Sequence, residues 1–359
     1  MLYIIPVYHV HTCTSGFLGA QTMEKRITLK DIADHCGLAA TTVSRILRDK
    51  STYCSAAKIE MVKRIAKEWN YSPNIGYNIM AGRNTNIAAI IFSQPRGTQD
   101  DQSNRLYMHL MHLLDNKGFA SYTAVMDYDL DSQMRKIRAL DERGCRYYFF
   151  VGTPANYECL FAFLDRMKRK YIGFDSLQSP RCIVPDRAGA YINYCDIIHR
   201  AGLKNICIAV TENYFENNII PRIPPAEQEN FRQHLLAVPP VRYIGNDINS
   251  HYFELGRMIT CRALSEVPEL DALAFTTDYH VFGAAAVLKE RGLYGKIRLF
   301  GMRDASASQF AGIDFTTTRF DVRAGAEQML EHIDSGDELK IIVPGQRIEY
   351  SSVKNDSHK

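Results

Sequence analysis

Residues 40–45 combine side chains that suit contact with double-stranded DNA. Ala40, Thr41 and Ser44 are small or polar, and Arg45 adds one long cation. An arginine can donate two hydrogen bonds to the O6 and N7 atoms of a guanine, and hydroxyl groups are good donors to phosphates. A helix with such a thin outer face ending in arginine has the shape to enter the major groove. These residues therefore predict a DNA-contacting helix.

Two short helices joined by a tight turn are predicted to position this face. They lie in Thr28–Leu47, TLKDIADHCGLAATTVSRIL, where Thr28 and Asp31 have the spacing of a capping box. Gly37 suits the left-handed position that ends the first helix. The second helix has an apolar inner face made by Val43, Ile46 and Leu47. The pattern is typical of a helix-turn-helix that directs Arg45 outwards.

A third helix and an excess of positive charge belong to the same segment. Ser55 is the predicted N-cap of a helix that runs to about Asn70, so three helices form a small bundle within residues 24–72. Residues 24–83 contain eleven Lys and Arg against six Asp and Glu, whereas residues 84–359 have a net charge of −2. Concentrated positive charge is typical of a module that binds a polyanion, with a merely solvated basic surface as the alternative.

Two flanking segments differ from this bundle. Residues 1–23 are predicted to be a disordered N-terminal extension. No basic residue precedes their apolar start and Pro6 interrupts it, which disfavours a secretory signal. In residues 73–83, Pro73 ends the preceding helix and Asn74 can cap a new one of about two turns. Because so short a helix is marginal in water, this segment is either a plain linker or a hinge that orders only against DNA.

The remaining residues, 84–359, alternate between apolar strands and helices. Apolar runs predict strands that begin at Ile87, Ser121, Arg146, Tyr171, Asn205, Val241, Ala272 and Lys296. Helical patterns lie between most of them, for instance in 131–143, 186–200 and 279–291. Such alternation predicts parallel sheets covered by helices on both faces. The number of strand–helix units exceeds what one hydrophobic core accommodates, so two lobes are expected. The predicted fold class is α+β and multidomain: an N-terminal three-helix helix-turn-helix domain and a two-lobed α/β core.

Other residues with reactive side chains form weaker patterns. His109 and His112 are three apart, and His9, His11 and Cys13 lie near the N-terminus, but such sets are more often solvated than metal-bound. Nine cysteines without metal-finger spacing favour reduced thiols in a cytoplasmic protein. The sequence lacks a phosphate-binding loop, a G-x-G-x-x-G turn and a G-x-S-x-G elbow. We therefore expect no enzyme activity, no cofactor and no metal, and the absence of an apolar window of about 18 residues predicts no membrane span.

From Thr28 to about Ser352 the chain resembles the lactose-repressor-type (LacI/GalR) transcription regulators. The specific part of the resemblance lies in four segments, T-L-K-D-I-A, C-G-L-A-A-T-T-V-S-R-I-L, N-Y-S-P-N and A-G-R-N-T-N-I-A. Weaker matches follow at 186–190, 277–284 and 316–320. The resemblance implies a homodimeric repressor that binds a pseudo-palindromic double-stranded DNA operator under the control of a small-molecule effector.

The resemblance also implies which residues contact DNA. This set comprises Thr28, Lys30, Ala40, Thr41, Thr42, Ser44 and Arg45, with Asn74, Tyr77 and Met80 from a hinge helix. Ala40, Thr41 and Arg45 are the implied base contacts. Thr42 and Ser44 are the implied contacts to the DNA backbone, and Lys30 is expected to contact a phosphate. Met80 occupies the position where relatives insert a leucine between base steps.

For the core, the resemblance implies a periplasmic-binding-protein-like fold with a ligand cleft between two lobes. Lobe 1 would contain residues 84–202 and 317–342, and lobe 2 would contain residues 203–316 and 344–352. The implied effector-binding residues are Asp186, Arg187, Glu227, Asp278 and Arg303. Asp278 matches an acidic residue that relatives use on ligand hydroxyls, and its alternative role is to cap the helix that it precedes.

Two departures from the family leave the identity of the effector open. Glu227 lies nearest to the position where relatives carry an effector-gripping arginine, and Gly301-Met-Arg-Asp304 replaces the usual G-F/Y-D-D. These changes remove one cation and add Arg303, so a carbohydrate or its derivative, an unrelated metabolite and a degenerate pocket all remain open. A solute-binding protein or an α/β enzyme are the alternatives for the same core fold, although a solute-binding protein would not carry the basic three-helix module.

Overall fold

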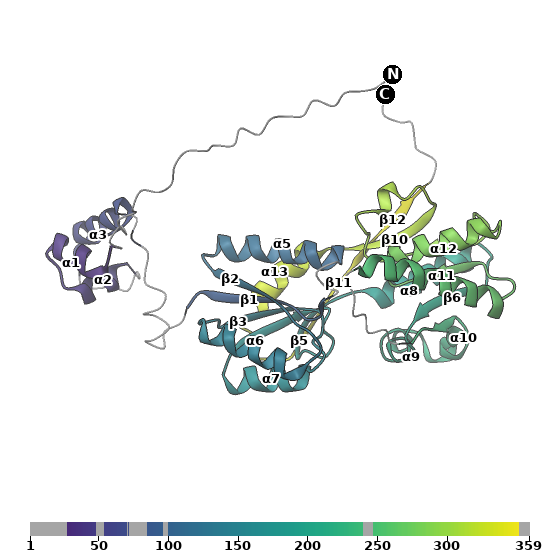
Figure 1. The fold of residues 1–359 in the computed structure, drawn as a ribbon, viewed down its shortest axis with the longest axis horizontal. Coiled ribbons are helices and arrows are strands. Elements are labelled where there is room, and N and C mark those ends of the chain that lie inside the picture. The colour runs from purple at the N-terminus through teal and green to yellow at the C-terminus, as the bar shows by residue number, and fades with distance from the viewer. Residues whose placement is uncertain are drawn as a thin grey trace, which may run out of the picture. The chain divides into compact units, whose positions relative to one another are not determined.

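The computed structural model describes residues 27–47, 54–69, 71, 85–95, 100–239 and 247–351 (Figure 1). The chain divides into two compact units, residues 1–81 and 82–359. The predicted extension 1–23 lies outside the described residues, as do the strand predicted from Val241 and the hinge residues Asn74, Tyr77 and Met80.

The first unit is the predicted helix-turn-helix bundle. Its helices are α1 (Leu29–Cys36), α2 (Ala40–Ile46) and α3 (Ala56–Glu68). Thr28 forms the capping box with Asp31, and Gly37 ends α1 in the left-handed conformation with φ 62°. The inner faces of the three helices share one apolar core, in which Ile32, Val43, Ile46, Val62 and Ile65 are buried. Ser55 occupies the N-cap position of α3, but its side chain makes no capping hydrogen bond.

The second unit contains two six-stranded sheets among the described residues. The order in the first sheet is β11 (Leu339–Val343), β5 (Arg181–Pro185), β4 (Lys170–Phe174), β3 (Tyr147–Val151), β1 (Ile87–Phe92) and β2 (Ala120–Val125). The order in the second sheet is β12 (Gly345–Tyr350), β10 (Phe315–Phe320), β9 (Arg298–Phe300), β8 (Ala272–Ala274), β6 (Ile206–Val210) and β7 (Leu235–Ala237). All neighbours pair in parallel except β10 and β12. The predicted two-lobed α/β core is confirmed.

Helices cover both faces of each sheet, because strands buried on both sides need apolar partners on both sides. In the first lobe α5 (Asp101–Asn116) and α13 (Val322–His332) pack on one face, and α6 (Leu130–Glu142) and α7 (Tyr157–Arg166) lie on the other (Figure 1). In the second lobe α8 (Arg187–Arg200) packs on one face, and α11 (Ile248–Glu266) and α12 (Asp278–Glu290) pack on the other. The short helices α9 (Glu212–Tyr214) and α10 (Gln228–Arg232) follow β6.

Three crossovers connect the lobes, and two of them differ from the predicted boundaries. Lobe 1 was predicted to extend to residue 202, but the chain already crosses after β5, because α8 packs on the second sheet through Tyr191, Tyr194 and Ile198. The return to lobe 1 was predicted at residue 317, but β10 continues to Phe320 and pairs with β9 and β12 of the second sheet. The third crossover runs from β11 to β12.

Candidate nucleic-acid surface and ligand cavity

The outer face of α2 presents the residues predicted to contact bases. Ala40, Thr41 and Arg45 are exposed, whereas Val43 and Ile46 on the opposite face are 0% and 1% exposed. Thr42 and Ser44 lie between these extremes and are half-buried. The core therefore fixes which side of α2 faces outwards. It leaves one guanidinium among small and hydroxyl side chains, as base recognition requires.

Thr28 and Lys30 lie at the start of α1 and differ in their surroundings. The Thr28 hydroxyl donates to Asp31 Oδ2 at 2.7 Å and accepts from the Asp31 backbone N–H at 3.3 Å. Its hydrogen-bonding capacity is therefore largely used to begin the helix. Lys30 is exposed one residue into the helix. At the other end of α1, the His35 ring packs edge-on against Trp69 of the third helix, with 4.8 Å between centroids.

A cavity of about 640 Å³ lies between the two lobes of the second unit. It is lined at the carboxyl ends of parallel strands, where ligands of open α/β sheets bind: Gly152 and Thr153 follow β3, Asp175 follows β4, Thr211 follows β6 and Thr276 lies beyond β8. A volume of this size is typical of sites for small molecules. The two arginines predicted to bind the effector, Arg187 and Arg303, both line it.

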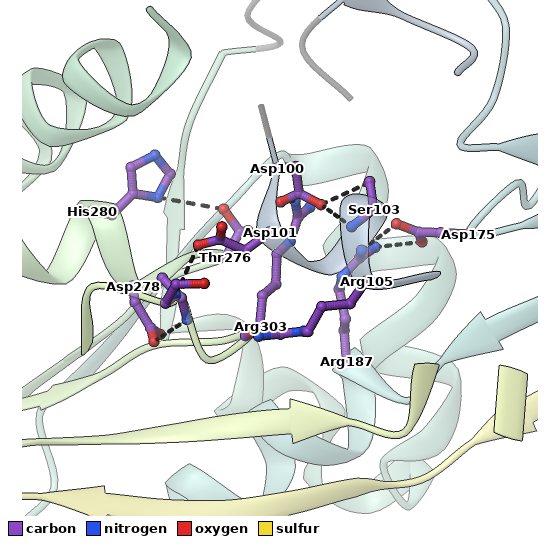
Figure 2. Close-up of polar contacts among 12 residues, drawn as sticks. Asp100, Asp101, Ser103, Arg105, Asp175, Arg187, Thr276, Asp278, His280 and Arg303 are labelled. Atoms are coloured by element: carbon purple, nitrogen blue, oxygen red, sulfur yellow. Dashed lines mark hydrogen bonds and ion pairs between the residues drawn. The ribbon is translucent and has the colours of Figure 1, made fainter. Parts of the chain in front are cut away.

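Two arginine–carboxylate pairs dominate the polar side of this cavity (Figure 2). Arg187 donates to both oxygens of Asp175, with Nη1 at 2.6 Å from Oδ1, and Arg303 Nη1 donates to Asp100 Oδ1 at 2.7 Å. Burial alone would lower the pKa of Arg187, but Asp175 raises it above its ordinary value. Burial alone would raise the pKa of Asp100, but Arg303 and hydrogen bonds from Ser103 lower it. The Arg187 guanidinium and the Asp100 carboxylate are therefore charged.

The backbone around Arg303 is held in an unusual conformation by the opposite lobe. Arg303 and Asp304 have φ of 81° and 47°, values that side-chain-bearing residues adopt at a cost. Arg105, from α5 of the first lobe, donates to the carbonyl oxygens of Arg303 at 2.7 Å and Asp304 at 3.1 Å. Tyr350 donates to the Asp304 carboxylate at 2.6 Å. Arg303 itself lines the cavity, and Figure 2 shows it together with Asp100 and Arg105.

Asp278 does not line the cavity and acts instead as a buried anchor. Its side chain is 0% exposed. One oxygen accepts from the Ala305 N–H at 3.0 Å and the Ser308 hydroxyl at 2.6 Å, and the other accepts from the Thr317 hydroxyl at 2.6 Å. Burial raises its pKa to about 7 against the effect of these bonds. Asp278 is also not the N-cap, because Thr277 occupies that position of α12.

The two other predicted effector residues also lie outside the cavity lining. Asp186 is the N-cap of α8, where it accepts from the Gly189 N–H at 3.0 Å and pairs with Arg222. Glu227 is exposed in a short 3-10 turn. The Asp186 side chain therefore serves local structure, by capping α8 and pairing with Arg222.

Among the cavity residues that were not identified from the sequence are two carboxylates and a histidine. Asp175 directly follows a buried strand and Asp100 is the N-cap of α5, so both occupied positions where a site could have been sought. His280 lies in the first turn of α12, and its pKa is lowered to about 3 by burial and by Arg303. It is therefore a neutral hydrogen-bonding group at ordinary pH.

Other chemistry considered from the sequence finds little support in the described residues. They contain no group of three or more His, Cys, Asp or Glu placed to hold a metal ion. Eight cysteines among them are free, and Cys13 with His9 and His11 lies outside the described part. His109 is half-buried and His112 is exposed on α5. Among the helices described, none has both the length and the apolar character of a membrane span.

Comparison with known proteins identifies similar chains. Residues 28–74 match the family model for bacterial regulatory proteins of the lacI family. The transcriptional regulator DegA of Bacillus subtilis is 24% identical over 164 residues, 45% of this chain and 46% of that protein. The sucrose operon repressor of Pediococcus pentosaceus is 29% identical over 109 residues, 30% of this chain and 31% of that protein. The chain thus spans less than half of the length of these curated relatives in the matched regions.

A structural match extends over nearly the whole chain. The crystal structure of the lac repressor dimer bound to operator and the anti-inducer ONPF is similar with a TM-score of 0.67, 16% identity, and coverage of 92% of this chain and all of that one. At this identity the match shows a shared fold. It agrees with the architecture described above, a helix-turn-helix bundle followed by two lobes that each contain a mainly parallel sheet.

Proposed function

Because residues 28–74 match the family model for lacI-family bacterial regulatory proteins, we propose that the chain is a sequence-specific DNA-binding transcriptional regulator of this family, acting as a repressor in the cytoplasm. A small molecule bound between its lobes would control its affinity for an operator. The observation that carries the proposal is the exposed outer face of α2, with Arg45 outward and the apolar face buried.

The proposed recognition mode assigns different tasks to two cations. Arg45 would read a base edge, because a bidentate arginine–guanine contact discriminates against other bases by roughly 1–3 kcal/mol. Lys30 would contact a phosphate, which adds affinity without sequence preference. Thr41 and Ala40 would complete the base-facing surface. The predicted hinge contacts of Asn74, Tyr77 and Met80 remain part of this proposal.

Selection of duplexes from a random DNA library tests this assignment. The parent chain should enrich a pseudo-palindromic site, and Arg45→Ala should relax the preference at one position in each half-site. Lys30→Ala should keep the same preferred site and bind every sequence more weakly. Enrichment of the same site with undiminished preference by Arg45→Ala would show that this residue does not read a base.

We propose that the functional form is a homodimer. Large apolar side chains are exposed on both lobes: Met108 and Tyr122 on the first are 62% and 42% exposed, and Met258 and Phe310 on the second are 68% and 81% exposed. Phe310 also borders a groove formed with α11 and α12. Apolar patches of this kind are typical of protein interfaces.

Sedimentation of Phe310→Asp against the parent chain tests the dimer. The aspartate should shift the chain towards the monomer, because a charge would be buried in the interface. Lys296→Asp, elsewhere on the second lobe, is a charge-changing control. Equal dimer fractions for Phe310→Asp and the parent would place the interface elsewhere.

The cavity offers a route for control of DNA binding. Each lobe contributes side chains to it, and Arg105 and Asp100 of the first lobe contact Arg303 of the second. A ligand that binds one arrangement of the lobes more tightly shifts the population towards that arrangement. Because α5 carries both Asp100 and the exposed Met108, such a shift would reach the proposed dimer surface. This coupling would change operator affinity.

A further inference from the structure

We propose that the cavity ligand is a small organic anion whose oxyanion group, a carboxylate or a phosphate ester, binds between the Arg187 and Arg303 guanidinium groups. This inference rests on the proposed role of the cavity as an effector site, and it names the chemical class of the effector. It is specific to this chain, because it depends on the Arg303 side chain and the ion pairs around it.

Both arginines face the cavity with hydrogen-bonding capacity left over. The Arg187 and Arg303 side chains keep 11% and 21% of their surface exposed, and both belong to the cavity lining. Within the described residues, the buried Nε–H group of each finds no acceptor. A buried donor normally has a partner, and a guanidinium has five donors in one plane. These two groups therefore call for an acceptor that the described residues do not supply.

The charges around the cavity favour a negatively charged acceptor over a neutral one. After burial and Asp175, Arg303 is the next influence on Arg187, and it acts to lower the Arg187 pKa. It also acts on His280, whose pKa burial already lowers. The two guanidinium groups therefore repel each other across a shared space. An oxyanion between them would offset this repulsion and form charge-assisted hydrogen bonds with both.

The carboxylates that now neutralise the arginines also explain how an anion would be sensed. Asp175 is engaged by two Arg187 nitrogens, whereas Asp100 holds Arg303 through a single nitrogen and accepts further bonds from Ser103. The Asp100–Arg303 pair is thus the one that an incoming anion can replace. Because this pair joins the two lobes, exchanging Asp100 for a ligand changes a contact between them. A neutral polyol would leave the pair in place.

The rest of the lining suits a hydroxylated body on this anion. Hydroxyl groups of Thr153, Thr211, Tyr214, Tyr252 and Thr276 surround the same cavity. Its volume of about 640 Å³ is within the range for small-molecule sites and exceeds the need of a bare phosphate. A sugar acid and a sugar phosphate are both of this kind, and the proposal covers the oxyanion that they share.

Calorimetric titration of the full chain at constant ionic strength tests the proposal. The probes are inorganic phosphate, gluconate, glucose 6-phosphate and uncharged glucose. We expect phosphate and at least one of the two organic anions to bind and to raise the melting temperature, and glucose to do neither. Gluconate binding without glucose 6-phosphate binding assigns the oxyanion to a carboxylate, and the reverse assigns it to a phosphate ester. Failure of every anion, or equal binding of glucose, would overturn the proposal.

Two substitutions with opposite expected effects separate binding from structure. Arg303→Gln should weaken the anion Kd by roughly 10- to 100-fold, the loss of one or two charge-assisted hydrogen bonds. Asp100→Asn should tighten it, because the competing carboxylate is gone while asparagine can still cap α5. Arg257→Gln, which removes an arginine paired with Glu290 on the outer helices, should leave the Kd unchanged.

The combination of results distinguishes this proposal from the proposed function. Weaker anion binding by both Arg303→Gln and Asp100→Asn would indicate a merely structural pair and overturn the anion site. If Arg303→Gln does not fold, the tighter anion binding expected for Asp100→Asn still tests the anion site. Operator binding by the parent chain is measured in parallel. If the chain binds an operator but no anion binds, only the ligand class is refuted. If the chain binds no DNA sequence specifically, the proposed function is refuted.

Discussion

Replacing Asp278 with asparagine should remove one carboxyl's contribution to the pH dependence of folding stability between about pH 4 and 7. The Asp278 carboxyl is 0% exposed, and burial raises its pKa to about 7, above the value of about 3.9 for an unfolded chain. In this range the folded chain binds a proton that the unfolded chain has released. Stability from this group is therefore fully present below about pH 4 and is lost as the pH rises to 7.

The size of the effect follows from the shift. Each pH unit in this window lowers the free energy of unfolding by about 1.4 kcal/mol, and a shift of about three units corresponds to about 4 kcal/mol in total. The upward shift in pKa persists although three donors, the Ala305 N–H and the Ser308 and Thr317 hydroxyls, oppose it. Asparagine carries no titrating group. The free energy of unfolding of the parent minus that of the variant should therefore decrease as the pH rises.

Urea unfolding of the full chain at intervals from about pH 5 to 7.5 measures this difference. Groups that are common to both chains cancel in the comparison. Asp247→Asn is a flat control, because hydrogen bonds from Ser250 lower the pKa of this exposed carboxyl, so its contribution to stability changes only below about pH 4 and stays constant across this range. A parent-minus-variant difference that stays constant, or grows with pH, would refute the assignment of Asp278 as a carboxyl dominated by burial.

Two further predictions follow from packing and burial. Gly283→Ala should destabilise the chain by roughly 1–3 kcal/mol in urea unfolding, because its Cβ would lie 1.9 Å from the Phe253 carbonyl oxygen, whereas Gly336→Ala, with no atom within 4 Å, should be neutral. A neutral Gly283→Ala would show that α11 and α12 are not in close contact. Thiol labelling of the native chain near pH 8 should modify exposed Cys159 before three cysteines whose pKa burial raises to about 11 or 12. These are Cys145, Cys195 and Cys207; their early labelling would contradict the described core.

The elements best predicted from the sequence are those whose local residue pattern directly reflects their environment in the fold. β1, β3, β4 and β6 are continuous apolar runs because both of their faces are buried. The capping box and the left-handed glycine of α1 are purely local signals, and both are present. Two edge strands of the second sheet were not predicted, because β12 is largely exposed and β7 has only three residues, whereas the edge strand β2 of the first sheet was predicted from Ser121.

The cavity could be predicted only in part, because its pairs are distant in sequence. Arg303 and Asp100 are 203 residues apart, and no local pattern indicates that they meet. The family resemblance implied a ligand contact for Asp278, but its side chain turns into the lobe towards Ser308 and Thr317. Tertiary packing decides which side chains line the cavity.

The salt dependence of DNA binding tests the central claim most directly. The operator selected by the full chain is titrated between roughly 50 and 200 mM salt, with the parent chain and Lys30→Ala compared. We predict that log Kd depends linearly on log salt, that affinity falls by roughly 10³-fold or more for six or more phosphate contacts, and that Lys30→Ala reduces the slope by about one. Affinity that stays unchanged over this range would contradict the account, because a basic helix-turn-helix on DNA must release counterions.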